Sequence, residues 1–166
     1  MTTTTPSPSL LSMGTELTLQ QLTQIAKAHL NAPTEWGDTS YDHDDLSSKM
    51  AAGWARKLKS DDAQGLLILA VLDAQSPEDD NVAGFVWAEL SQNPGPHAHI
   101  RSLWVRPQNR RQGVAYRLKA ELETWAMAQG AQWIQTEVHI DNSAMRALNT
   151  KLGYHDTFIQ QKKTLG

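Results

Sequence analysis

A short stretch in the second half of the chain combines basic side chains with a glycine in a way that suits an anion. It reads Arg-Arg-Gln-Gly-Val-Ala over residues 110–115. Gly113 permits close approach of a ligand to the backbone, the small Ala115 keeps the start of the next helix uncrowded, and two arginines add positive charge. A pyrophosphate fits these features. An ordinary basic turn before a helix is the alternative.

Side chains that could move a proton lie on the strands expected around this turn. His99 lies eleven residues before Arg110, and because histidine titrates near neutral pH it could relay a proton through water. The alternative is that His99 only lines its strand. Glu89 on the preceding strand, and Glu137 or His139 on the strand after the turn's helix, are the other candidates for a base. The sequence does not rank these three.

Composition narrows the classes of protein that remain. The chain has 166 residues, a net charge of -3 and no cysteine. Without cysteine there is no disulfide, thiolate zinc site or cysteine nucleophile, and we expect no metal. The acidic balance argues against nucleic-acid binding, which needs a basic face. The longest apolar run, residues 66–72, is far shorter than the roughly 20 residues of a membrane helix. A small ligand is the expected partner.

The chain reads as one domain after a short tail. Residues 1–14 are rich in Thr, Ser and Pro without a basic segment before the leucines at 10 and 11, so we expect a disordered tail, no secretory signal and a cytoplasmic protein. Residues 15–166 form the domain. Hydrophobic spacing predicts helices, with Thr18 capping the first, and strands in the order of an α/β protein. The helices are 19–30, 46–58, 113–130 and 141–152; the strands are 65–74, 82–90, 97–105, 133–140 and 154–161.

The turn resembles the acetyl-CoA turn of the GNAT acetyltransferases. That family's pattern is Arg/Gln-x-x-Gly-x-Gly/Ala after a strand ending in Val, and Arg110, Gly113 and Ala115 match it after Val105. The resemblance covers about residues 65–161. It implies an α/β (α+β) fold with a mixed central sheet flanked by helices, in which the usual first strand has only residues 16–19 as a candidate.

A second GNAT signature, Asn-x-x-Ala-x-x-x-Tyr-x-x-x-Gly-Phe, corresponds to residues 142–154. Asn142 and Gly153 match, whereas Met145 stands for Ala and Asn149 for Tyr. Family members use that tyrosine as an acid for the leaving thiolate. A thiol of pKa about 8.5 leaves as thiolate for roughly 2 kcal/mol at pH 7, against roughly 4.6 kcal/mol to deprotonate an amine. We therefore expect the base to matter more, and Asn149 to offer at most a weak hydrogen bond.

The resemblance implies an N-acetyltransferase that moves an acetyl group from acetyl-CoA to a primary amine by direct attack. A catalytically silent acyl-CoA-binding module that senses or scaffolds is the alternative. Backbone groups of the strand would bind pantetheine and the acetyl carbonyl, turn amides and arginines would bind phosphates, and an asparagine would lie near the pantetheine. These residues are, in turn, Leu103 and Val105; Arg110, Arg111, Gln112, Gly113, Val114 and Ala115; and Asn142.

An acidic stretch suggests the nature of the acceptor. Residues 31–45 carry five carboxylates and no Lys or Arg, and in GNAT-like folds this region borders the acceptor side of the cleft. It could attract a polycationic amine by steering it or holding a second charge, or it could be a solvated loop without a role. Six tryptophans are enough to place one or two at a homodimer interface. The carboxylates are Glu35, Asp38, Asp42, Asp44 and Asp45.

Overall fold

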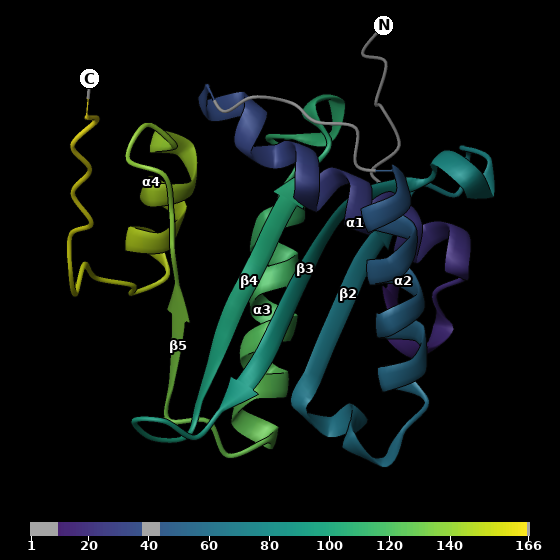
Figure 1. The fold of residues 1–166 in the computed structure, drawn as a ribbon, viewed down its shortest axis with the longest axis horizontal. Helices are drawn as coiled ribbons and strands as arrows, with labels where there is room; N and C mark the ends of the chain where they lie inside the picture. The colour runs from purple at the N-terminus through teal and green to yellow at the C-terminus, as the bar shows by residue number, and fades with distance from the viewer. Residues whose placement is uncertain (1–9, 38–43, 166) are drawn as a thin grey trace, which may run out of the picture.

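A central mixed sheet with helices on both faces organises the molecule (Figure 1). The computed structural model describes residues 10–37 and 44–165. The sheet order is β1-β2-β3-β4-β5, antiparallel up to β4 and parallel between β4 and β5. This confirms the predicted fold class. The strands are β1 (Leu10–Met13), β2 (Leu66–Leu72), β3 (Val82–Ser91), β4 (His97–Val105) and β5 (Trp133–Thr136); the helices are α1 (Leu19–Asn31), α2 (Asp44–Leu58), α3 (Val114–Ala128) and α4 (Ser143–Lys151).

Two apolar clusters hold the helices against the sheet. All seven residues of β2 are buried, because helices cover both faces and leave neither side of the strand to water. Ile68 and Phe85 belong to the cluster under α1 and α2, whereas Leu69 and Val86 belong to the cluster under α3. In Figure 1, α1 and α2 lie in front of the sheet and α3 behind it.

The N-terminal part differs from the sequence interpretation. Residues 10–13, assigned to a disordered tail, pair with β2 as β1. Residues 16–19 are not the first strand: a 3-10 turn (Gly14–Glu16) leads into α1 there. Thr18 caps α1 as predicted, in a capping box with Gln21. Strand β1 was missed because four residues carry little periodicity, and the long-range pairing with β2 decides their conformation.

The C-terminal part is less regular than expected. The strand predicted at 133–140 ends at Thr136, and residues 154–161 form no strand. Asn142, not Asp141, caps α4 by accepting a hydrogen bond from the Met145 amide. Within residues 10–37 and 44–165, each helix is too short or too polar to span a bilayer.

A glycine on β3 sets the position of α3. A Cβ on Gly84 would lie 2.8 Å from Cγ1 of Val114, so only glycine lets the first turn of α3 sit this close to the sheet. Val114 is buried there. The close approach brings the turn at 110–113 to the carboxyl end of β4.

Candidate active site

The site begins where two parallel strands separate. Strand β5 pairs with β4 only from His97 to Ile100, opposite Trp133 to Thr136, while β4 continues to Val105. Over residues 101–105 the β5-facing edge of β4 therefore has no strand partner within the described part of the chain. The backbone groups on this edge are available to a ligand, except the Val105 carbonyl, which accepts from Arg110 Nε.

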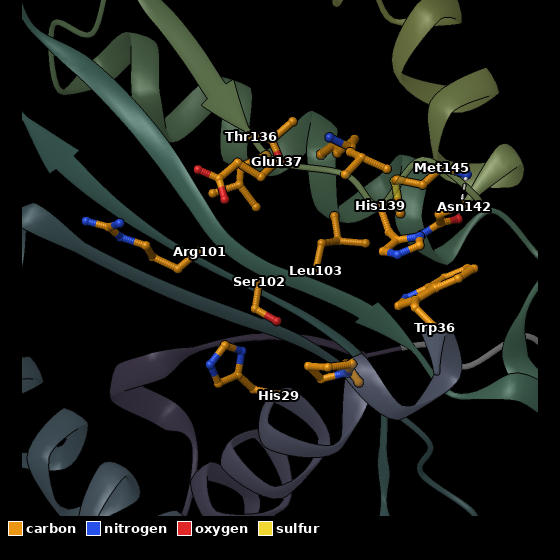
Figure 2. Close-up of a pocket in the computed structure, with 15 residues that line it drawn as sticks. His29, Trp36, Arg101, Ser102, Leu103, Thr136, Glu137, His139, Asn142 and Met145 are labelled. Atoms are coloured by element: carbon orange, nitrogen blue, oxygen red, sulfur yellow. Dashed lines mark hydrogen bonds between the residues drawn. The ribbon is translucent and has the colours of Figure 1, made fainter. Parts of the chain in front are cut away.

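A cavity of about 320 Å³ fills this separation. Figure 2 shows Ser102 and Leu103 of β4 in its centre, with His29 on one side and Glu137 and His139 on the other. The cavity thus touches the α1 side and the α3 side of the sheet, which suits two ligands that meet in the gap. Its lining residues are His29, Ala32, Pro33, Trp36, Ile100, Arg101, Ser102, Leu103, Lys119, Thr136, Glu137, Val138, His139, Asn142 and Met145.

The turn before α3 has the backbone of an anion site. Arg111 has φ of 63° and Gly113 has φ of 78°, both in the left-handed region that bulky residues rarely adopt. Helix α3 begins at Val114, so its first-turn amides have no partner within the helix. The predicted phosphate ligands come together here: Arg111, Gln112 and Gly113 are exposed, and Ala115 is half-buried.

Arg110 forms contacts within the protein that the sequence did not predict. Its Nη2 donates to both carboxylate oxygens of Glu35 at 2.8 and 3.0 Å, and its Nε donates to the Val105 carbonyl at 2.9 Å. The Trp104 indole also donates to Glu35. These bonds fasten the 3-10 turn η2 (Ala32–Trp36) to the end of β4. Contact between Arg110 and a phosphate stays a prediction.

A stacked aromatic pair closes the other side of the cavity. The Trp36 ring lies 5.3 Å from the His139 ring at an interplanar angle of 14°. Trp36 belongs to η2 and His139 follows β5, so the contact spans the gap between the strands (Figure 2). Arg110 and Trp36 together hold η2 across the opening.

His29 is a proton-accepting candidate that sequence reasoning missed. It lies on α1, lines the cavity and packs edge-on against Trp87 with 5.2 Å between ring centres. Burial lowers the pKa of His29 from 6.5, so the neutral ring predominates at pH 7. In the sequence, His29 is one polar residue of an amphipathic helix. His29 lines the cavity between β4 and β5 only because α1 packs against β3 and β4.

The predicted bases His99 and Glu89 lie outside the residues that line the cavity. They are cross-strand partners on β4 and β3. Glu89 pairs with Arg101 at 3.2 Å and with Lys57 at 3.9 Å, which ties it to structural cations. Burial first, and then the Arg101 charge, lower the pKa of His99. Their catalytic roles stay predictions.

The two asparagines of the second signature separate. Asn142 lines the cavity, although its Oδ1 accepts from the Met145 amide at 3.1 Å. Asn149 is 8% exposed and lines a different cavity, of about 770 Å³, between β5, α4 and the C-terminal segment. Its Oδ1 is buried without a hydrogen-bond partner among the described residues. Asn149 is therefore absent from the lining of the cavity between β4 and β5.

Three of the five carboxylates in the acidic stretch form ion pairs. Glu35 pairs with Arg110, Asp44 with Lys27 at 2.9 Å and Asp45 with Lys49 at 2.6 Å. Asp44 and Asp45 belong to the first turn of α2 and not to a loop. The other two, Asp38 and Asp42, lie outside the described residues.

This fold and site define a class of protein. A mixed sheet flanked by helices, with a glycine turn between a strand and the following helix, is the arrangement that the sequence resemblance predicted. The opening between the parallel strands β4 and β5 is a finding of the structure. Residues 19–154 match the acetyltransferase (GNAT) family. The chain belongs to this family.

Relatives of known name match part of the chain. A 73-residue segment is 32% identical to the aminoglycoside N(6')-acetyltransferase type 1 of Acinetobacter genomosp. 13 and covers 43% of this chain and 50% of that protein. A 76-residue segment is 37% identical to the N-alpha-acetyltransferase daf-31 of Caenorhabditis elegans and covers 42% of this chain and 38% of that protein. The chain thus spans half or less of the length of these relatives.

Solved structures match the fold over nearly the whole chain. An acetyltransferase of Trypanosoma brucei has a TM-score of 0.65 at 16% identity and covers 94% of this chain and 99% of its own. AAC(6')-Iy in complex with the bisubstrate analog CoA-S-monomethyl-acetylneamine has a TM-score of 0.62 at 18% identity and covers 95% of this chain and 100% of its own. These similarities show the fold.

Proposed function

We propose that this protein transfers an acetyl group from acetyl-CoA to a primary amine. The observation that carries the proposal is the gap between β4 and β5 beyond Ile100, with a cavity in it and an anion-binding turn beside it. The donor supplies an acyl group activated as a thioester. The amides of Gln112 to Ala115 suit its pyrophosphate, and the unpaired edge of β4 suits its pantetheine arm.

His29 is the base that the geometry favours. A lysine-like ammonium must lose a proton, at about 4.6 kcal/mol at pH 7, before it can attack. His29 is neutral, faces the cavity from the α1 side and could accept that proton directly or through water. Backbone amides on the β4 edge could stabilise negative charge on the carbonyl oxygen. His139, stacked on Trp36, is the second candidate base.

We further propose that the acceptor carries more than one amino group. Similarity to aminoglycoside acetyltransferases supports this, as does Glu137, an exposed carboxylate on the cavity wall. A second ammonium group of the acceptor could pair with Glu137, which would strengthen binding of the acceptor without raising the pKa of the reacting amine. Glu35 contributes less, because Arg110 already neutralises it.

The test is release of free CoA thiol from acetyl-CoA with a panel of amines, including aminoglycosides, diamines and their monoamine analogues. Turnover with at least one amine is the expected result, with a higher kcat/KM for the diamines that falls in Glu137→Gln and at high salt. Binding of acetyl-CoA without thiol release for any amine would instead support the silent acyl-CoA-binding module. Equal rates for diamines and monoamines would contradict the proposal that the acceptor carries more than one amino group.

A further inference from the structure

A buried lysine lies in the wall of the cavity. Lys119 on α3 is only 3% exposed, and its Nζ lies 4.3 Å from the centre of the Tyr154 ring. None of the ion pairs formed within residues 10–37 and 44–165 includes it. Burial alone lowers the pKa of Lys119 to about 8.

The fold gains little from this cation. Lysines normally keep the ammonium in water while the stem packs on apolar surface, and a buried charge without an anionic partner is unfavourable. The neighbouring core of α3 is apolar, with Leu118 and Leu122 fully buried. The cation–π contact with Tyr154 offsets part of the desolvation. The part of the desolvation cost that Tyr154 does not offset is a reason to expect a negatively charged ligand beside Lys119.

Lys119 lines the cavity in which the two proposed ligands would meet. Leu103 of β4, Thr136 of β5 and Asn142, the N-cap of α4, line the same cavity. Along α3, Lys119 lies four residues after Ala115, which is one turn or about 6 Å of helix. It is thus set beneath the separated strands, one turn beyond the anion-binding turn.

The geometry points to Lys119 as the catalytic acid that stabilises and protonates the leaving thiolate, a role that rests on the proposed function. When the carbon–sulfur bond of the thioester breaks, its electron pair stays on sulfur. The Lys119 ammonium gives a proton to that sulfur and becomes a neutral amine, which then regains a proton from water. Lys119 would thereby take the role of the tyrosine whose place in the second signature Asn149 occupies.

The electrostatic surroundings suit this chemistry. A donor whose pKa is about 8 is nearly matched to a thiol of pKa about 8.5, so the proton moves without a large barrier in either direction. Burial raises the pKa of Tyr154 to about 12, so its ring offers Lys119 a neutral π face. The other titratable or charged side chains that line this cavity are Glu137 and His139 after β5, Arg101 on β4 and His29 on α1. Glu123, on the same helix as Lys119, acts on Tyr154.

The test titrates the thiol of bound CoA. Each protein is saturated with CoA, with affinity measured by calorimetry, and the thiolate is followed by its ultraviolet absorbance as pH rises. The set comprises wild type, Lys119→Met, Lys119→Arg and the control Lys151→Met, which removes an exposed lysine of α4. In wild type and in the control we expect a thiol pKa at least about 1 unit below its free value.

Lys119→Met should return the thiol pKa to about 8.5 or above. Lys119→Arg keeps the charge but cannot give up its proton, so it should keep the thiol pKa low while kcat falls. A wild-type protein that binds CoA with an unshifted thiol would overturn the role of Lys119 and leave the proposed function intact. Acetylation of Lys119 itself, seen by mass spectrometry during turnover, would also overturn it. Failure of wild type to bind CoA would overturn the proposed function as well.

Discussion

Replacing Lys119 with methionine should make the folded protein more stable. Methionine has a similar length and no charge, so it fills the same space without desolvating an ammonium. A fall in the pKa of Lys119 from 10.5 to about 8 corresponds to about 3 kcal/mol of unfavourable burial of the charged form. At pH 7 we expect the free energy of unfolding of Lys119→Met to exceed that of the wild type by up to this amount, less the contribution of the Tyr154 contact. For a domain of this size the melting temperature would rise by about 6–12 °C.

The pH dependence identifies the cause. Above a pKa of about 8 the folded protein has lost the proton, whereas the unfolded chain keeps it up to about 10.4. The unfolded state therefore binds more protons in this window, and wild-type stability rises with pH. Between pH 7 and pH 9.5 the free energy of unfolding of the wild type should rise by about 2 kcal/mol from this residue. Lys119→Met should lack it.

Urea denaturation of wild type and Lys119→Met at pH 7.0, 8.5 and 9.5 measures the difference. Values above pH 10 are not used, because burial raises the pKa of Tyr154 to about 12 and its titration then lowers stability. The informative quantity is the gap between the two proteins. A gap that stays constant across these pH values, or a variant less stable than wild type at pH 7, would refute an unpaired buried cation at this position.

Four further substitutions test the site and its support. Gly113→Val should abolish binding of acetyl-CoA by calorimetry while the circular dichroism spectrum stays native, because a β-branched side chain blocks the approach of a phosphate to the turn backbone. The φ of 78° adds strain of about 1–2 kcal/mol for such a residue. Asn149→Ala should reduce turnover less than tenfold, since its side chain lies outside the gap. His29→Gln should lower kcat by about 100-fold or more without weakening CoA binding, whereas His155→Gln, at an exposed histidine, should not. Thr18→Ala should remove the cap of α1 and about 1 kcal/mol of stability, which a thermal melt detects.

Each of these expectations has an opposing result. Unchanged acetyl-CoA affinity in a folded Gly113→Val protein would remove the donor site from this turn. A larger loss in Asn149→Ala would mean that Asn149 positions one of the substrates. Equal rates in His29→Gln and wild type would transfer the base to His139 or to a residue of β3 or β4.

Local signals in the sequence were enough for the framework of the fold. The hairpin of β2 and β3, strand β4 and helix α3 follow from apolar runs, from helical spacing and from glycine and proline breaks, all of which act over a few residues. The turn around Gly113 was readable for the same reason, because left-handed backbone and first-turn amides are properties of consecutive residues. The cap at Thr18 is equally local.

The tertiary structure alone decided which side chains meet. His29, Trp36 and Lys119 come from three elements, and each looks ordinary in its own helix or turn. They share a cavity because the pairing of β5 with β4 ends at Ile100. The sequences of the two strands do not predict where this pairing ends. The engagement of Arg110 by Glu35 spans 75 positions. Contacts between residues so far apart in the sequence depend on how the helices pack on the sheet. The hydrophobic periodicities of helices and strands are local and do not predict such contacts.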